Sequence, residues 1–587
     1  MVDTLSVADS GELRLVNKKP TALRALFTSV QLAIVAALAV VATPALAGDP
    51  PVEFQTGDLV ISSSFYQGNN STITVGQGLP SVTVDANSNP TTTPIAAVAN
   101  GSYPNVFNND SQVSIGSSGK LNSTTVDANF GVTSQIVLSD VSATTGAIKD
   151  SITLAAPTGF NASNGLVTSF SSKSELALNL SSDGTQLTFM GYTAPVNAVD
   201  VSNSNTPGVI DPSNNDMQTA TYRAIGSINA FGQLTVTPTN AYSGNNGRAV
   251  LLLNGNYYMV GNGGNGNGIA PKSGEIASPN AIVSNTGVQM LAAGGGPNTT
   301  VVGAQQGTVG AKNGWQFGFA AATPDKSGKD DNFRGLTVFD NTIYTSKGSG
   351  SNGVNSVYQV GPGGVLPTAG SASSTAITTL PGFPATGTSS NPFGIWFANA
   401  TTMYVSQEGD GTATFNSNGT VKSFDAGGGL QKWTFSGGTW NLDYTLTSGL
   451  NLGSTYSVTG GLNADGSINP TGTGASVLAA TDGLRNLTGK VNSDGSVTLY
   501  AITSTISTSG DQGADPNKLV AITDTLADTM ASQASAESFT TLDTAEYGEV
   551  LRGVSFAPTT PVPLPAAGWL LVSGLGALGA ARRRRRA

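Results

Sequence analysis

A unit of four short, apolar-polar alternating segments recurs along this chain, and it constrains the fold more than any other feature. The clearest copy covers residues 393–398, 402–406, 429–435 and 438–446. Other copies begin at residues 333 and 484, and less regular ones begin at residues 247 and 174. Each segment is rich in Val, Ile, Thr, Tyr and Phe and alternates with period two, which predicts a β-strand.

Turn signals separate the segments. Ser182-Asp183-Gly184, residues 464–466 and residues 493–495 each place Asp-Gly between two apolar runs, and glycine accepts the positive φ of a tight hairpin. Residues 526–536 are the one stretch of the mature region that is expected to form a short helix. The sequence therefore predicts an all-β chain of successive hairpins.

Four-stranded repeats at this spacing are typical of a β-propeller, in which each blade buries its faces against its neighbours. The chain ends with a lone first-strand segment, residues 551–558, whereas residues 59–66, 134–139 and 147–154 resemble second, third and fourth strands. We therefore expect the last strand to complete the first blade, which removes an exposed sheet edge. The repeats predict about six blades, or seven if residues 287–319 hold another, and a β-solenoid or a set of sandwiches is the alternative.

The two ends of the chain predict export. Basic residues precede an apolar segment at 32–41, and the small residues Ala45 and Ala47 follow it, which is the pattern of a signal peptide cleaved after Ala47. A retained N-terminal anchor is the alternative. We expect a signal peptide at 1–47, a β-propeller domain at 48–561 and a sorting tail at 562–587.

The tail has three parts. A proline motif of Pro563, Leu564 and Pro565 precedes an apolar stretch at 566–581 that contains Trp569. Five arginines follow it: Arg582, Arg583, Arg584, Arg585 and Arg586. An apolar stretch of sixteen residues is at the short limit for a transmembrane helix, and the arginines would hold its end on the cytoplasmic side.

This tail resembles the PEP-CTERM sorting signal of Gram-negative bacteria that make exopolysaccharide. The resemblance implies recognition and cleavage by an exosortase, and a mature protein at the cell envelope, the cell surface or the extracellular matrix. The chain departs from the motif at Leu564, where the family's name implies an acidic residue. An anchor that stays in the membrane is the alternative. The mature region is also similar to a family of uncharacterised secreted bacterial proteins with propeller-like repeats, through strings such as 181–184, 187–192, 243–248, 429–433 and 551–558.

Composition excludes several classes of function. The chain has no cysteine and no histidine, which excludes disulfides, thiolate nucleophiles and imidazole bases. Of its 26 basic and 36 acidic residues the two ends hold nine basic and three acidic, so the mature region carries a net charge of −16. Such a surface repels nucleic acid and anionic lipid, and no nucleic-acid partner is expected.

Three sets of residues are candidates for binding. Asp325, Asp330 and Asp331 form the densest acidic loop, which would bind calcium or else be a solvated connection. An arginine recurs near the start of the repeats, as Arg223, Arg248, Arg334, Arg485 and Arg552. Together these arginines would surround a channel and bind an anion, or each would tie neighbouring blades together, which we favour. Aromatic residues near loops would stack on sugar rings or fill the core: Tyr103, Tyr242, Tyr257, Tyr258, Trp315 and Trp396.

These features predict an exported, non-enzymatic binding protein at the cell surface or in the matrix, with exopolysaccharide as its expected partner. No cofactor is expected apart from calcium, and no catalytic residue is assigned. A hydrolase or lyase that works through carboxylates or calcium, and a structural component of a surface layer, are the alternatives.

Overall fold

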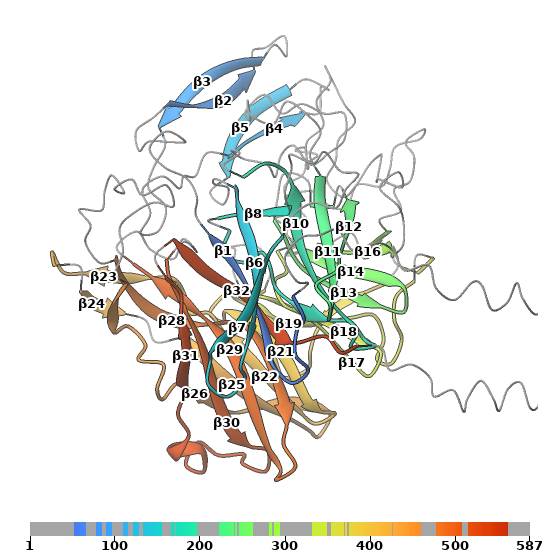
Figure 1. Ribbon diagram of the computed structural model, residues 1–587, viewed down its shortest axis with the longest axis vertical. Coiled ribbons are helices and arrows are strands. Elements are labelled where there is room, and N and C mark those ends of the chain that lie inside the picture. The colour runs from blue at the N-terminus through green and yellow to red at the C-terminus, as the bar shows by residue number, and fades with distance from the viewer. Residues whose placement is uncertain are drawn as a thin grey trace, which may run out of the picture. The chain divides into compact units, whose positions relative to one another are not determined.

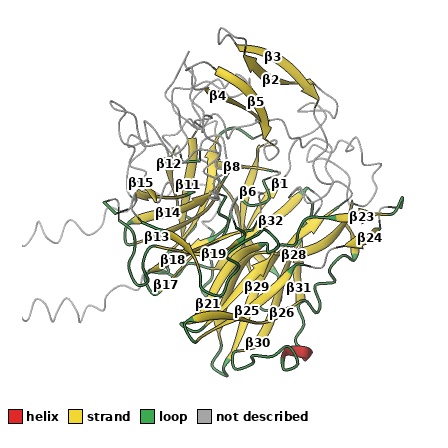
Figure 2. Cartoon of the chain, turned by 180° about the vertical axis from the view of Figure 1, so that it is seen from behind, coloured by secondary structure: helices red, strands yellow, loops and turns green. Residues whose placement is uncertain are grey.

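The computed structural model describes most of the chain between residues 52 and 560. The described ranges are 52–65, 78–84, 90–96, 110–115, 121–127, 133–154, 166–170, 172–196, 222–239, 241–242, 246–261, 281–283, 287–293, 332–348, 354–368, 370–371, 375–418, 420–424, 427–458, 477–507, 513, 515–546 and 548–560. Within them every regular element is a β-strand except one 3-10 turn, η5, at Ala534–Ala536 (Figures 1 and 2). The helix predicted at 526–536 is therefore wrong except for this turn, and the all-β prediction is confirmed.

Four antiparallel sheets each come from one continuous stretch of chain, as propeller blades do. Their orders are β13-β14-β16-β15, β17-β18-β19-β20, β21-β22-β25-β26 and β27-β28-β29-β30-β31. Their strands are β13 (Gly247–Leu253), β14 (Asn256–Gly261), β15 (Ala281–Val283), β16 (Val288–Ala292), β17 (Leu336–Phe339), β18 (Thr342–Lys347), β19 (Ser356–Val360), β20 (Ile377–Thr379), β21 (Pro392–Asn399), β22 (Thr402–Gln407), β25 (Gly429–Ser436), β26 (Thr439–Leu446), β27 (Thr455–Val458), β28 (Val477–Val491), β29 (Ser496–Ile506), β30 (Lys518–Thr525) and β31 (Thr540–Thr544).

A fifth sheet has nine strands and joins the two ends of the described chain. Its path is β12-β11-β10-β8-β6-β1-β32, with β7 paired to β6 and β9 paired to β10. Its strands are β1 (Leu59–Phe65), β6 (Thr133–Val141), β7 (Ile148–Thr153), β8 (Leu166–Ser169), β9 (Asn179–Leu180), β10 (Gln186–Thr193), β11 (Tyr222–Asn229), β12 (Leu234–Thr239) and β32 (Glu549–Phe556). Three separate hairpins are β2 (Gly78–Val84) with β3 (Pro90–Ala96), β4 (Asp110–Ile115) with β5 (Leu121–Asp127), and β23 (Ala413–Phe415) with β24 (Val421–Phe424).

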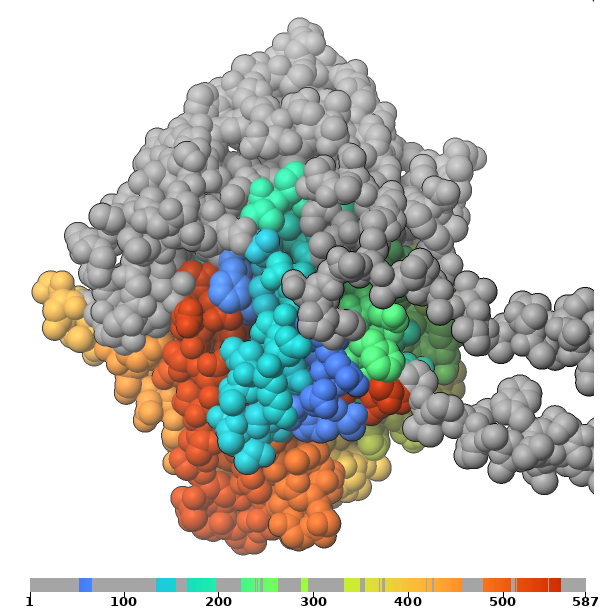
Figure 3. Space-filling view, viewed as in Figure 1, coloured from blue at the N-terminus to red at the C-terminus, as the bar shows by residue number. Residues whose placement is uncertain are grey.

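The last strand pairs with the first, as the sequence predicts. β32 lies antiparallel to β1, with Leu59 opposite Phe556, and β1 pairs with β6 on its other side. Figure 3 shows these segments together on one face, where the blue, cyan and red parts of the chain adjoin. The edges of β1 that would otherwise be exposed are therefore paired.

The sheets form a β-propeller arrangement, but the predicted number of blades is not confirmed. Four sheets are separate blades, whereas β8 pairs with both β6 and β10 and so joins the remaining strands into one nine-stranded sheet. Two of the three predicted turns are present, since Gly184 and Gly495 adopt φ of +71° and +85°, and the third, at 464–466, lies outside the described residues. In the second turn the Asp494 carboxylate accepts the Ser496 N–H at 3.0 Å.

Apolar side chains are buried between consecutive sheets. Val260 of β14 and Ile343 of β18 belong to one fully buried cluster, and Tyr404 of β22 and Leu499 of β29 belong to another. Burying a side chain of this size stabilises the fold by about 1.5–3 kcal/mol. The sheets are therefore held face to face by apolar contacts.

A serine bridge occurs three times, twice between separate sheets and once within the nine-stranded sheet. In each, the hydroxyl of a second-strand serine accepts the N–H of a first-strand glycine in its own sheet and donates to a main-chain carbonyl of the next unit. The bridges are Gly553–Ser62–Leu176, Gly335–Ser346–Phe393 and Gly394–Ser406–Arg485. A Cβ on Gly335 would lie 1.9 Å from the Phe393 carbonyl oxygen, so only glycine permits this approach.

Candidate functional site

A cavity of about 260 Å³ lies where the sheets meet, and it is the candidate site. Six stretches of chain line it: 177–180, 249 with 251, 335–338, 394–396, 486–489 and 554–556. These stretches include or adjoin β9, β13, β17, β21, β28 and β32. Each belongs to the first strand of one sequence repeat.

The lining is neutral. Among the described residues it consists of Ala, Leu, Asn, Gly, Thr, Val, Ile, Trp, Ser and Phe and contains no ionisable side chain. Consecutive residues of several strands line the cavity. Neighbouring side chains of a strand point to opposite faces of its sheet, so a cavity against one face would be lined by every second residue only. The strands therefore turn an edge toward the cavity, and β13, β17, β21 and β32 are edge strands of their sheets. An edge presents main-chain N–H and C=O groups outside the ladder.

Trp396 is the largest side chain of the lining. The residue is half-buried and packs over Gly489 of β28, where an added Cβ would lie 3.1 Å from the indole ring. The Tyr404 ring lies 6.1 Å from Trp396 between centroids. Gly489 thus makes room for the indole at the junction of two sheets.

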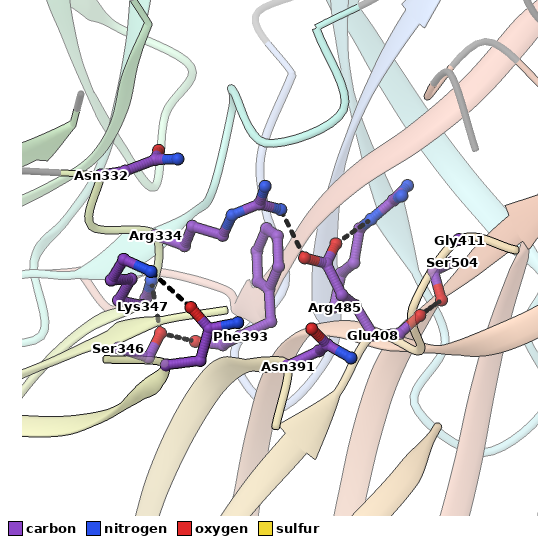
Figure 4. Close-up of polar contacts among 12 residues, drawn as sticks. Asn332, Arg334, Ser346, Lys347, Asn391, Phe393, Glu408, Gly411, Arg485 and Ser504 are labelled. Atoms are coloured by element: carbon purple, nitrogen blue, oxygen red, sulfur yellow. Dashed lines mark hydrogen bonds and ion pairs between the residues drawn. The ribbon is translucent and has the colours of Figure 1, made fainter. Parts of the chain in front are cut away.

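Arginines adjoin the lining stretches of the cavity in the sequence. We call Arg248, Arg334, Arg485 and Arg552 the arginine end, because each precedes a lining stretch or lies within two residues of one. All four are at most 3% exposed. Figure 4 shows Arg334 and Arg485 on either side of Glu408.

Glu408 bridges two of these arginines from different sheets. Its Oε1 lies 2.6 Å from Arg334 Nη1 and its Oε2 lies 3.3 Å from Arg485 Nε. The Arg334 guanidinium also lies 5.5 Å from the Phe393 ring centroid. Glu408 follows β22 and is 2% exposed, so this carboxylate joins three consecutive sheets.

The other arginines make contacts of the same kind. Arg248 Nη1 donates to the Phe333 carbonyl at 2.9 Å. Arg552 donates to the Phe170 carbonyl and, from Nε, to Ser64 Oγ at 3.3 Å. These contacts confirm that Arg248, Arg334, Arg485 and Arg552 tie neighbouring units together.

Arg223 lies apart from the arginine end and forms a buried ion pair within the nine-stranded sheet. Its Nη1 lies 3.1 Å from Glu175 Oε1, which also accepts the Tyr192 hydroxyl at 2.7 Å. Near the arginine end, burial and the charge of Arg248 lower the pKa of Lys347 to about 8. Lys347 donates to the Asn355 amide oxygen (Figure 4 labels Lys347).

A second ionic cluster lies between β22, β25, β26 and β30. Lys432 Nζ and Asp524 Oδ2 are 2.8 Å apart and both side chains are fully buried. The Tyr444 hydroxyl donates to Asp524 Oδ1 at 2.6 Å, and Tyr404 donates to the same carboxylate. Burial and Asp524 raise the pKa of Glu537, beside this cluster, to about 7.

The structure separates the predicted aromatic candidates. Tyr242, Tyr257 and Tyr258 are at most 3% exposed and belong to the core, whereas Trp396 lines the cavity. Tyr103 and Trp315 lie outside the described residues.

The predicted sorting and metal residues also lie outside the described ranges: Ala45, Ala47, Asp325, Asp330, Asp331, Pro563, Leu564, Pro565, Trp569 and Arg582 to Arg586. Among the described residues no group of three or more acidic side chains is placed to hold a metal ion. No helix in the described ranges is long and apolar enough to span a membrane. The predicted apolar segments at 32–41 and 566–581 fall outside these ranges.

Sequence reasoning missed the acidic partners Glu408, Glu175 and Asp524. One signal was available: in a chain with only 11% charged residues, Asp524 stands inside the apolar strand Lys518–Thr525. A carboxylate in such a position needs a buried partner. The sequence did not indicate that Lys432 is this partner, because the two residues meet only when two sheets pack.

Comparisons with known proteins show no family for this chain. No family model and no curated protein matches it. Among solved structures, apo AztD from Citrobacter koseri aligns with 7% identity and a TM-score of 0.25, over 85% of this chain and 99% of that one. An acylaminoacyl peptidase in complex with Z-Gly-Gly-Phe-chloromethyl ketone aligns with 8% identity and a TM-score of 0.25, over 81% of this chain and 54% of that one. Likeness at this level is too low to bear on function, which is argued below from the residues of this chain.

Proposed function

We propose that this protein is an exported, non-enzymatic binding module of the cell surface or extracellular matrix, associated with exopolysaccharide. The observation that supports this best is the neutral cavity where the sheets meet. A cavity whose described lining has no ionisable group offers hydrogen bonds and apolar contacts, which are the means of binding, and no described side chain for acid–base catalysis. Of the charged groups beside it, Arg334, Arg485 and Glu408 form ion pairs between sheets, and Arg248 and Arg552 donate to main-chain carbonyls.

We propose six blades for the propeller. The nine-stranded sheet would count as two blades, β32-β1-β6-β7 and β9-β10-β11-β12, joined by β8. The cavity supports this division, because one lining stretch comes from each of six repeats. The apolar clusters support it too: one joins β1 and β6 to β10 and β11, and another joins β10 and β11 to β13 and β14.

Delivery to the surface is proposed from the two ends of the sequence. Cleavage after Ala47 would release the chain from its signal peptide. The tail from Pro563 to Arg586 would hold it in the membrane until an exosortase cleaves near Pro563-Leu564-Pro565. A Gram-negative cell envelope is the compartment that this signal implies.

Binding of the mature region, residues 48–561, to the exopolysaccharide of the producing bacterium tests the function. We expect saturable binding in a sedimentation or surface-binding assay. Running it with calcium and with a chelator tests the acidic loop of Asp325, Asp330 and Asp331 separately, since loss of binding with the chelator would assign a calcium role. Absence of binding in both conditions would contradict the proposed function and favour a structural role in a surface layer.

A further inference from the structure

We infer that the cavity is a binding site for a single neutral sugar ring, with Trp396 as its apolar wall. This inference rests on the proposed function, because it names the ligand class of the same cavity. Four properties of the cavity carry it: charge, hydrogen-bonding groups, the indole ring and size.

The charge of the site favours a neutral ligand. The described part of the lining holds no ionisable side chain, so an anionic or cationic ligand would lose its hydration without gaining an opposite charge. Burying an unpaired charge is strongly unfavourable. Of the arginines that adjoin the lining in the sequence, Arg334 and Arg485 are paired with Glu408, and Arg248 and Arg552 donate to main-chain carbonyls. A uronic acid or a phosphosugar should therefore bind less well than a neutral ring of equal size.

The hydrogen-bonding groups favour a ligand rich in hydroxyls. The strands turn edges toward the cavity, and an edge carries main-chain donors and acceptors in alternation, of which those of Gly335 and Gly394 are bonded within the protein. Thr337 and Thr488 are half-buried lining residues of β17 and β28, and no hydrogen bond involves their hydroxyls within the described part of the chain. A sugar hydroxyl both donates and accepts, so it can pair with either kind of main-chain group.

Trp396 supplies the apolar surface that a sugar ring needs. A pyranose presents C–H groups on one face, and a half-buried indole offers a flat apolar partner for that face. Gly489 supports the indole from the opposite sheet, where a larger residue would displace it. The ring is thus fixed before a ligand arrives.

Size limits the ligand to one ring. Ligand pockets usually enclose about 300–1,000 Å³, and this cavity of about 260 Å³ lies just below that range. The site would therefore hold one terminal or branching residue of a polysaccharide, or a free monosaccharide.

Titration of the full-length chain with monosaccharides tests the inference. The protein is kept in a polyoxyethylene detergent, which carries no sugar headgroup, and binding is followed by calorimetry and by saturation-transfer NMR. The probes are glucose, galactose, mannose and N-acetylglucosamine, with glucuronate as the charged match. We expect saturable binding of at least one neutral sugar and at least tenfold weaker binding of glucuronate.

Matched variants locate the site. Trp396→Phe should weaken binding about fivefold or more, because a smaller ring loses part of the apolar contact. Its control is Trp440→Phe, a tryptophan of β26 that is 7% exposed and does not line the cavity. Thr488→Val removes one hydroxyl at constant shape and should weaken binding about threefold or more, while Thr541→Val on the exposed face of β31 should not.

The outcomes separate this inference from the proposed function. Binding of the whole exopolysaccharide without binding of any monosaccharide, or with no effect of Trp396→Phe and Thr488→Val, would overturn the cavity site and leave matrix binding standing. Binding of a neutral sugar that both cavity variants weaken, without binding of the exopolysaccharide, would support the site and contradict the matrix role. Absence of both kinds of binding would overturn both proposals.

Discussion

The Ser62 hydroxyl donates a 2.7 Å hydrogen bond to the main-chain oxygen of Leu176, 114 residues away in the sequence. The same hydroxyl accepts the Gly553 N–H at 2.8 Å, 491 residues away. One small side chain thus connects the first, second and last parts of the described propeller. Ser346 and Ser406 make the same pair of contacts at two other interfaces.

Replacing a bridge serine should destabilise the protein. In Ser62→Ala, Ser346→Ala or Ser406→Ala, a buried N–H and a buried carbonyl each lose a partner, so each change should lower the free energy of unfolding by about 1–3 kcal/mol. Urea unfolding followed by tryptophan fluorescence measures it. Ser423→Ala in the exposed part of β24 is the control and should change stability by less than about 0.5 kcal/mol. If the bridge variants are as stable as the control, the serine hydrogen bonds do not stabilise the fold.

Removing the charge of Glu408 should be more costly. Glu408→Gln leaves Arg334 and Arg485 buried at the arginine end without their shared carboxylate, and losing one partner of a buried ion pair costs about 3–5 kcal/mol. Thermal unfolding by circular dichroism measures the change. Glu53→Gln, at an exposed position, is the matched control. A Glu408→Gln protein as stable as the control would show that this ion pair does not hold the sheets together.

The repeated arginines show which contacts can be predicted from the sequence. Arginine recurs at the start of successive repeats, and this spacing was enough to predict ties between neighbouring units, which Arg248, Arg334, Arg485 and Arg552 make. The pairing of the last strand with the first was predicted as well, because residues 551–558 lacked the other three strands of a unit. Local patterns and repeats thus predicted the strands and their closure.

The sequence could not predict what forms only when sheets pack. In the sequence, Glu408 cannot be told from any other polar residue that follows a strand. It comes to lie between Arg334 and Arg485 only when three sheets pack together. The cavity is likewise invisible in the sequence, since its lining residues are ordinary members of apolar strands. Trp396 is one of six aromatic candidates in the sequence, and only the structure separates it from the buried tyrosines.

Removing one partner of the buried pair of Lys432 and Asp524 should destabilise the protein more than replacing both partners with apolar residues. Asp524→Asn leaves a fully buried ammonium group without its carboxylate and should destabilise the protein by about 3–5 kcal/mol. The double variant Lys432→Met with Asp524→Leu removes both charges and should be more stable than Asp524→Asn alone. Chemical unfolding of both variants measures the difference.

The partly exposed pair of Lys149 and Asp58 is the comparison for this experiment. The side chains of Lys149 and Asp58 are 46% and 13% exposed, so water screens this pair and Asp58→Asn should cost less than Asp524→Asn. If Asp524→Asn and Asp58→Asn cost the same, burial does not govern the strength of these ion pairs.

Glu549 should make stability fall as the pH rises toward neutrality. Burial raises the pKa of Glu549, on β32, from 4.5 to about 7. The folded state therefore holds a proton that the unfolded state has lost between these two values. This contribution is fully present below about pH 4.5 and is lost as the pH rises through about 7, with a total of about 2–3 kcal/mol. Glu537, whose pKa is raised to about 7 by burial and by Asp524, acts in the same direction.

Glu549→Gln tests this dependence. The amide does not titrate, so the variant should lose less stability than the parent protein between about pH 5 and about pH 7.5. Unfolding midpoints in urea at several pH values measure it, and Glu53→Gln serves as the exposed control. A pH profile that is unchanged in Glu549→Gln would contradict the assignment.

The C-terminal tail should determine whether the protein is retained in the membrane or released. Under the proposed sorting, replacing Pro563, Leu564 and Pro565 with alanine removes the recognition motif but keeps the apolar stretch and the arginines. The uncleaved chain should then stay in the membrane fraction, because the stretch at 566–581 is long enough to anchor it. Fractionation and mass measurement of the mature protein from the producing bacterium give the readout, with Pro558→Ala as the control outside the motif. Equal release of both variants, with the same C-terminal mass, would contradict processing at this motif.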